Sequence, residues 1–153
     1  MLLSTCSIYH PIVRRYAGDG ATDRTSMGTS SSFLVYFAGT TTLADASRSL
    51  ARSLSVVEAG DLLRVRWRDG SEPEFTVGLG TGDHVAREAA EIGARHGVDE
   101  FNAFDRRFEV GIDDLDAALD ETNTLIEVQL TLQDLTSGYL VLSWNGAVQA
   151  PGG

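Results

Sequence analysis

The most regular hydrophobic pattern in the chain covers residues 113–135 and has helical spacing. Side chains expected to face the core recur there every three or four residues: Leu115, Leu119, Thr122, Ile126, Gln129 and Leu132. Further apolar residues in the second half widen this surface, which favours contact with more than one element. The pattern predicts a single central helix about 30 Å long, at about 1.5 Å per residue.

A second set of side chains repeats at the same spacing on the other side of this predicted helix. Most of them are acidic: Asp113, Asp116, Asp120, Asn123, Glu127, Thr131 and Asp134. In the first turn, the helix dipole stabilises negative charge, and Asp113 with Asp116 forms an acidic variant of the capping box. Asp120, Glu121, Glu127 and Asp134 have no such structural explanation. We therefore expect an exposed acidic helix face.

Five segments have the pattern of β-strands. Residues 33–38 and 139–144 are continuously apolar, which predicts strands covered on both faces of a sheet. Residues 63–68, 74–79 and 107–112 alternate apolar and polar positions, which predicts strands with one exposed face. Placing the apolar sides of the first two alternating strands together requires a hairpin with these pairs: Trp67 with Phe75, Val65 with Val77, and Arg68 with Glu74.

Two further segments have helical spacing. An amphipathic helix is expected after the threonines at 40–42, ending near residue 55, and another over 83–96, with Gly97 as its stop. A glycine-rich bend, 78–82, precedes the second helix. Such a bend can bind an anion, but the P-loop and dinucleotide motifs are absent, and Thr81 or Asp83 is expected to cap the helix. A plain strand-to-helix turn is the favoured interpretation.

The predicted order is β-α-β-β-α-β-α-β, which indicates a single α+β domain with a mixed five-stranded sheet and helices packed on it. The two apolar strands belong inside this sheet and the hairpin towards an edge. Residues 33–149 form the predicted globular domain. Residues 1–32, rich in Gly, Ser and Thr towards their end, are expected to be a disordered or loosely attached extension, and residues 150–153 a frayed end. Met27 is an alternative start to Met1.

The charge is both large and unevenly distributed. The chain has a net charge of −10 and a pI near 4.6, which disfavours binding to nucleic acids or to anionic membranes. Residues 1–107 carry 14 acidic and 12 basic residues, whereas residues 108–153 carry 8 acidic residues and no Lys or Arg. No apolar segment approaches the roughly 20 residues of a membrane-spanning helix. A single cysteine, Cys6, fits a reducing compartment, so a cytoplasmic protein is expected.

No arrangement of residues indicates catalysis. His10, His84 and His96 lie in unrelated segments, and no serine lies in a nucleophile-elbow motif. On a helix, His84 with Glu88 and Glu91 has the spacing of a metal site, but ion pairs with neighbouring arginines explain the same positions. We expect a protein that is not an enzyme and has no metal or cofactor.

The acidic helix face suggests a binding function. We expect it to attract a basic protein, with these partner-binding residues: Asp113, Asp116, Asp120, Glu121, Glu127 and Asp134. Small acidic inhibitors and immunity proteins neutralise basic toxins in this manner, which makes such a role the leading hypothesis. One alternative is a structural domain or a homo-oligomer, with the acids serving only solubility. A small enzyme is a further alternative.

Overall fold

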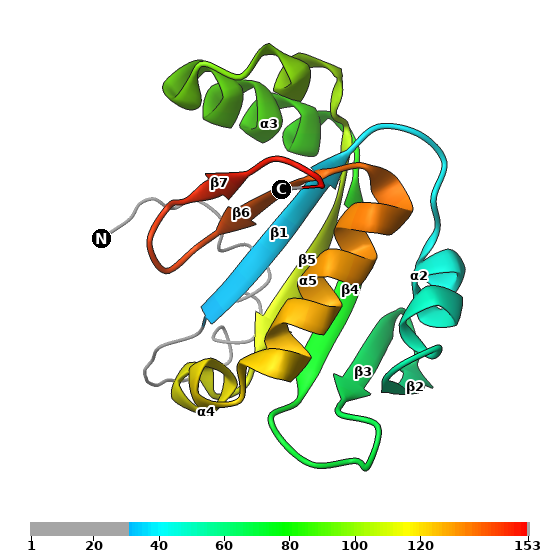
Figure 1. Ribbon diagram of the computed structural model, residues 1–153. Helices are drawn as coiled ribbons and strands as arrows, with labels where there is room; N and C mark the ends of the chain where they lie inside the picture. Colours follow the sequence, from blue (N-terminus) through cyan, green and yellow to red (C-terminus); the bar gives the residue numbers. More distant parts are fainter. Residues whose placement is uncertain (1–30, 153) are drawn as a thin grey trace, which may run out of the picture.

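A seven-stranded antiparallel sheet organises the protein (Figure 1). The computed structural model describes residues 31–152, so residues 1–30 of the predicted extension, the alternative start at Met27 and the role of Cys6 lie outside the described residues. Ser31 and Ser32, which the prediction placed in that extension, belong to the first strand and are buried. The strands are β1 (Ser31–Phe37), β2 (Ser55–Ala59), β3 (Leu62–Arg66), β4 (Phe75–Thr81), β5 (Arg106–Ile112), β6 (Tyr139–Leu142) and β7 (Val148–Gln149). Their order in the sheet is β2-β3-β4-β5-β1-β6-β7.

The α+β class and the five predicted strands are confirmed, but two details of the sheet were wrong. Every strand pair is antiparallel, so the sheet is not mixed. Two further strands, β2 and β7, lie at the two edges. Their sequences gave little signal, because β2 follows the predicted helix directly and has mostly exposed side chains, and β7 has only two residues.

The hairpin of β3 and β4 has a different register from the predicted one. Val65 lies opposite Phe75 and Leu63 opposite Val77, so β3 is displaced by two residues. An even displacement keeps each side chain on its face of the sheet, which is why the apolar face was still assigned correctly. Glu74 pairs with Arg64 and Arg66 in place of Arg68.

Four α-helices and one 3₁₀ helix are present within residues 31–152. They are α2 (Leu43–Leu50), α3 (Asp83–His96), η2 (Asp99–Ala103), α4 (Leu115–Asp120) and α5 (Thr122–Thr136). Thr42 and Asp45 form a capping box at the start of α2. Gly97 ends α3 in the left-handed conformation, as predicted.

Helices cover both faces of the sheet. On one face, called the α5 face, Phe33, Val35 and Phe37 of β1 pack in one core with residues of α2, α4 and α5 (Figure 1). On the opposite face, called the α3 face, Leu34 and Tyr36 pack with α3 and η2. The alternation of β1 thus supplies two cores, which explains why its sequence is apolar at almost every position.

The predicted single helix over 113–135 is wrong, because the backbone leaves the helical conformation at Glu121 (φ −111°, ψ 69°). Ala118 in α4 and Thr124 in α5 are both completely buried. The two helices still share one core, because Ala118 of α4 packs in the same cluster as Leu125 and Leu132 of α5.

The glycine-rich bend before α3 has a packing explanation. A Cβ atom on Gly80 would lie 2.7 Å from the Glu109 carboxylate, and one on Gly78 would lie 2.9 Å from Leu62. The N-cap of α3 is Gly82, and it makes no side-chain capping hydrogen bond, so the predicted cap by Thr81 or Asp83 is wrong. Both contacts are with the ends of flexible side chains, which lie close over β4 at these glycines. Gly78 and Gly80 belong to this strand, so the predicted bend over 78–82 is confined to its end.

Candidate functional site

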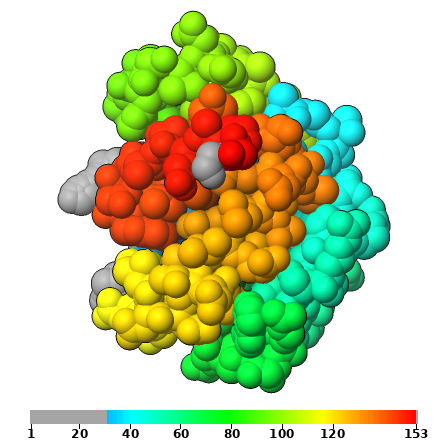
Figure 2. Space-filling view, viewed as in Figure 1, coloured from blue at the N-terminus to red at the C-terminus, as the bar shows by residue number. Residues whose placement is uncertain are grey.

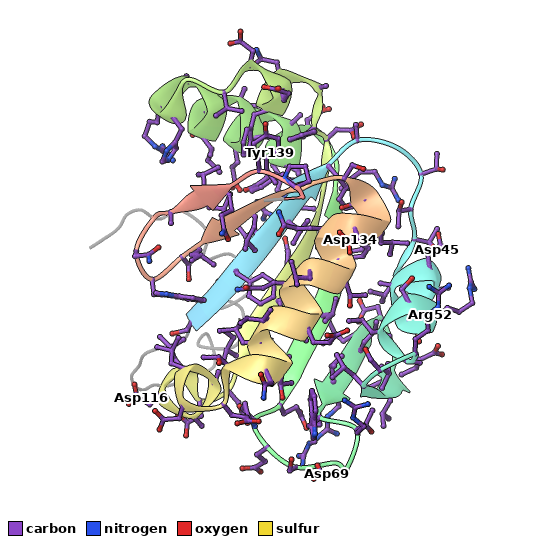
Figure 3. The ribbon with its side chains drawn as sticks, viewed as in Figure 1. Asp45, Arg52, Asp69, Asp116, Asp134 and Tyr139 are labelled. Atoms are coloured by element: carbon purple, nitrogen blue, oxygen red, sulfur yellow. The ribbon has the colours of Figure 1, made fainter. Side chains whose placement is uncertain are left out.

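Helices α4 and α5 form a continuous ridge across one side of the molecule (Figure 2). The α4–α5 surface is defined here by four carboxylates and three apolar side chains: Asp116, Asp120, Glu121, Asp134, Leu119, Ile126 and Leu130. All seven residues are exposed. Asp116 and Asp134 mark its two ends, on α4 and near the end of α5 (Figure 3).

The four carboxylates of this surface make no ion pair or side-chain hydrogen bond with other residues of the 31–152 region. Five ion pairs occur in that region, and their acidic partners are Asp45, Glu74, Glu88 and Glu109. Because residues 108–153 contain no Lys or Arg, the charge of the surface is not offset by its own elements. It therefore presents a negative potential to solvent.

Asp113, a predicted partner-binding residue, joins two elements instead. Its carboxylate accepts a hydrogen bond from the Glu74 amide at 3.3 Å, and its own amide donates to the Glu74 carbonyl at 3.4 Å. Partial burial raises the pKa of Asp113, and the nearby charges of Glu72 and Glu74 act in the same direction. The N-cap of α4 is the neighbouring Asp114, whose carboxylate accepts a hydrogen bond from the Ala117 amide, so the predicted capping box of Asp113 and Asp116 is wrong. These two carboxylates fix the start of α4.

Glu127, another predicted partner-binding residue, also has a contact within the protein. The Ser53 hydroxyl, just beyond α2, donates a hydrogen bond of 2.8 Å to its carboxylate. Glu127 is half-buried, and this bond links α5 to the α2 side of the domain. Four of the six predicted site residues thus lie on the open α4–α5 surface, while Asp113 and Glu127 are held by other elements.

The apolar members of the surface were not recognised from the sequence as exposed. Leu119, Ile126 and Leu130 are 44%, 46% and 45% exposed, whereas the pattern placed Leu119 and Ile126 in the core. Ile126 and Leu130 are one helical turn apart, with Asp134 one turn further, so they form a row along α5. The sequence did contain one indication of this exposure: residues 113–135 carry more apolar positions than a single covered helix face can bury.

A separate polar cluster lies on the α3 face and is built around Arg107, which is only 1% exposed. This Arg107 cluster comprises Tyr36, Glu88, Arg107 and Glu109. The guanidinium donates through Nε to Glu109 at 2.7 Å, and through an Nη atom to the Tyr36 hydroxyl at 2.9 Å and to Glu88. Burial raises the pKa of Tyr36 well above its usual range, so this hydroxyl stays protonated.

One guanidinium faces two carboxylates in the Arg107 cluster. Burial acts to lower the pKa of Arg107, but Tyr36, Glu109 and Glu88 raise it above its ordinary value, so the guanidinium stays charged. Each of the three partners points its polar atom at Arg107, which leaves the cluster satisfied internally. We interpret it as a structural element that anchors α3 to β1 and β5.

A small cleft opens beside this cluster, between α3 and β6. Its volume is about 250 Å³, and Leu34, Ile92 and Val141 contribute apolar lining with Glu88, Glu91 and His96 nearby. Typical small-molecule pockets enclose about 300–1,000 Å³. The cleft is therefore shallow for a ligand site, and its one buried polar neighbour, the Arg107 cluster, already has its partners.

Neither of these regions assembles a recognisable metal centre. Within residues 31–152, no group of three His, Cys, Asp or Glu side chains is arranged to hold a metal ion. The His84, Glu88 and Glu91 set considered above is divided, because the Glu88 carboxylate is directed at Arg107.

Comparisons with known proteins gave no match: no family model, no curated protein and no solved structure is similar to the chain. In the part of the chain that the structure describes, no helix has the length and apolar character needed to cross a membrane.

Proposed function

We propose that the domain is a non-enzymatic protein-binding module whose α4–α5 surface engages a basic protein. The observation that carries this proposal is the mixed composition of that surface. Leu119, Ile126 and Leu130 are each close to half exposed, and four exposed carboxylates occur in the same segment, three on the two helices and Glu121 between them. Protein interfaces commonly place apolar anchors within a polar rim, and the anchors supply most of the affinity.

The chemistry of the partner follows from the charge of the surface. Every formal charge in residues 108–153 is negative, so arginine or lysine side chains around an apolar patch would complement both parts of the surface. Long-range attraction of this kind speeds association, and it weakens as salt is added because the Debye length falls. Apolar contacts at the interface would mainly lower the rate of dissociation.

The acidic face expected on one long helix is divided between α4 and α5. The break at Glu121 separates Asp116 and Asp120 from Asp134, so the carboxylates are distributed over two helices. The exposed apolar row of Ile126 and Leu130, with Asp134 one turn further along α5, supports a binding role. Solubility alone accounts for exposed carboxylates, whereas Ile126 and Leu130 are adjacent on α5 and both exposed, which favours a contact surface.

The specific form of the proposal is an inhibitor or immunity protein that covers the cationic active surface of a toxin or another basic enzyme. It rests on the small size of the protein and on its charge of −10. An inhibitor must also act on its partner, so we expect the retained partner to have an enzymatic activity that the wild-type domain suppresses at a stoichiometry of one to one.

The test begins with the full chain as bait at about 50 mM and about 300 mM salt, since screening separates charge-driven capture from other binding. A retained basic protein is then measured against two variants. Neutralising Asp116, Asp120, Glu121 and Asp134 to the amides should slow association about tenfold at low salt. Replacing Ile126 and Leu130 with serine should mainly accelerate dissociation.

The matched control carries the same number of amide substitutions elsewhere on the surface: Asp61→Asn, Glu72→Gln, Asp99→Asn and Glu100→Gln. All four of these residues are exposed and lie outside α4 and α5. The proposal fails if no basic protein is retained at low salt. It fails equally if the two fourfold variants slow association to the same extent, because net charge alone would then be responsible.

A further inference from the structure

The edge strand β2 has unpaired backbone groups on its outer side among the residues that the structure describes. Within 31–152 it is a terminal strand of the sheet and pairs only with β3. Val57 at its centre is 57% exposed, the highest value among the large apolar side chains of residues 31–152. Natural edge strands are commonly protected by proline, by charged side chains or by a bulge, and Ser55–Ala59 has one charged residue, Glu58, and no proline. The opposite edge, β7, has only two residues.

The hairpin turn determines which groups of β2 face outward. Ala59 and Leu62 close a two-residue turn, Gly60 and Asp61, in which Gly60 has a φ of +67°. The closing pair of such a turn is hydrogen-bonded, and hydrogen-bonded pairs alternate along an antiparallel ladder. Ser55, Val57 and Ala59 therefore bond to β3. The N–H and C=O groups of Val56 and Glu58 point away from the sheet.

We propose that two copies of the protein associate by antiparallel pairing of their β2 strands about a twofold axis at Val57. In this register, Val56 of each protomer lies opposite Glu58 of its partner, which uses all four outward groups of each strand and forms four hydrogen bonds. The two Val57 residues form a non-hydrogen-bonded pair, in which side chains approach most closely. The two sheets then become one continuous sheet.

The strand is complementary to itself in this register. The most exposed apolar side chain meets its own copy, and each Glu58 lies opposite a valine, so the two carboxylates do not face one another. The Ser47 hydroxyl also donates to Glu58 at 3.2 Å, which holds this carboxylate towards α2 and away from the edge. A twofold axis at Val56 or Glu58 would use fewer outward groups, and one at Glu58 would oppose two like charges.

The association should be weak and dependent on concentration. Pairing along five residues buries less than the roughly 1,200 Å² typical of stable interfaces, and such contacts are characteristically transient. Strand β2 and helix α4 lie apart, at opposite sides of the view in Figure 1, so the proposed pairing does not use α4. The inference is therefore independent of the proposed function.

Disulfide trapping tests the register directly in the full chain, with Cys6→Ser removing the single native thiol. Val57→Cys should form a covalent dimer under mild oxidation, because paired residues at this position have Cα atoms about 4.5 Å apart. Ala59→Cys is the matched control: it lies opposite Ser55 of the partner, about 13 Å from the other Ala59 along the strand. A dimer from Ala59→Cys but not from Val57→Cys would overturn the proposed pairing.

Light scattering during size exclusion tests the association without cross-linking. The wild-type mass should rise towards that of a dimer as concentration increases, and Val57→Lys should raise the dissociation constant at least about tenfold, since two lysines would meet at the axis. Leu130→Lys introduces the same charge at a similarly exposed apolar position on α5 and should leave the dimer intact. A monomeric mass at every concentration, or equal loss in both variants, would refute the proposal.

Discussion

Replacing Arg107 with methionine tests whether the Arg107 cluster holds α3 onto the sheet. Methionine replaces the unbranched aliphatic stem of the arginine in a position that is 1% exposed, but it removes the positive charge that faces Glu88 and Glu109. Glu109 is only 9% exposed, so its carboxylate would be left buried without a cation. Removing one partner of a buried ion pair costs about 3–5 kcal/mol.

This loss should be large relative to the total stability of the domain. The free energy of unfolding of a small domain is about 5–15 kcal/mol, and urea lowers it by about 1–3 kcal/mol per molar. Arg107→Met should therefore lower the midpoint of urea unfolding by roughly 2 M. Fluorescence of the two tryptophans, Trp67 and Trp144, together with circular dichroism, follows the transition.

The same variant should acquire a distinctive pH dependence. Without Arg107, burial favours the neutral form of Glu109, so the folded state binds more protons than the unfolded state. Stability then increases as the pH falls from 8 towards 5, the sign expected when the folded state takes up protons. Adding Glu109→Gln removes the buried charge and should recover much of the loss at pH 7.

Arg87→Met is the matched control, because Arg87 is exposed on α3 and its replacement should change stability by less than about 0.5 kcal/mol. A loss below about 1 kcal/mol in Arg107→Met at pH 7 would contradict the estimate for a buried pair. So would a loss that stays constant between pH 8 and pH 5, since the carboxylates would then not be its cause.

Three further predictions concern other positions in the fold, each measured by urea unfolding. The Thr124 hydroxyl is buried without a hydrogen-bond partner in the described part of the chain, so Thr124→Val should stabilise by about 1 kcal/mol, whereas Thr124→Ser should not; a less stable valine variant would contradict this. A Cβ on Gly93 would lie 2.6 Å from Phe101, so Gly93→Ala should cost about 1–3 kcal/mol, and Gly111→Ala, with open space around it, should be nearly neutral; equal effects would refute the packing argument. The hydrogen bond from Arg64 lowers the pKa of Glu74, so the ionised Glu74 stabilises the fold above its ordinary pKa of 4.5, and this stabilisation is lost as the pH falls below that value. Glu74→Gln should therefore be less stable at pH 7, and its free energy of unfolding should decrease less steeply than that of the wild type between pH 5 and pH 3. An unchanged dependence of the unfolding free energy on pH would exclude this role.

The candidate site was only partly predictable from the chain. Its carboxylates Asp116, Asp120, Glu121 and Asp134 were identified by their spacing and by the absence of neighbouring bases, and the structure leaves them exposed. The apolar half of the surface was missed. Residues 113–135 carry more apolar positions than one helix face can bury, so periodicity could not determine which of them would remain exposed.

Local features of the fold were determined by the sequence itself. The α3 helix spans the predicted residues 83–96, and the alternation of β3, β4 and β5 assigned their apolar faces correctly. These features depend on neighbours within a few residues, through the helical period, the left-handed glycine at 97 and the two-residue period of a strand.

Only the tertiary structure decided the register of β3 on β4, the break at Glu121 and the edge position of β2. A shift of two residues preserves every inward side chain, so a sequence pattern cannot distinguish the two registers. The core that Ala118 of α4 shares with Leu125 of α5 is lined by strands from distant parts of the chain. Spacing fixes which side chains share a face, but what covers that face depends on contacts between remote segments.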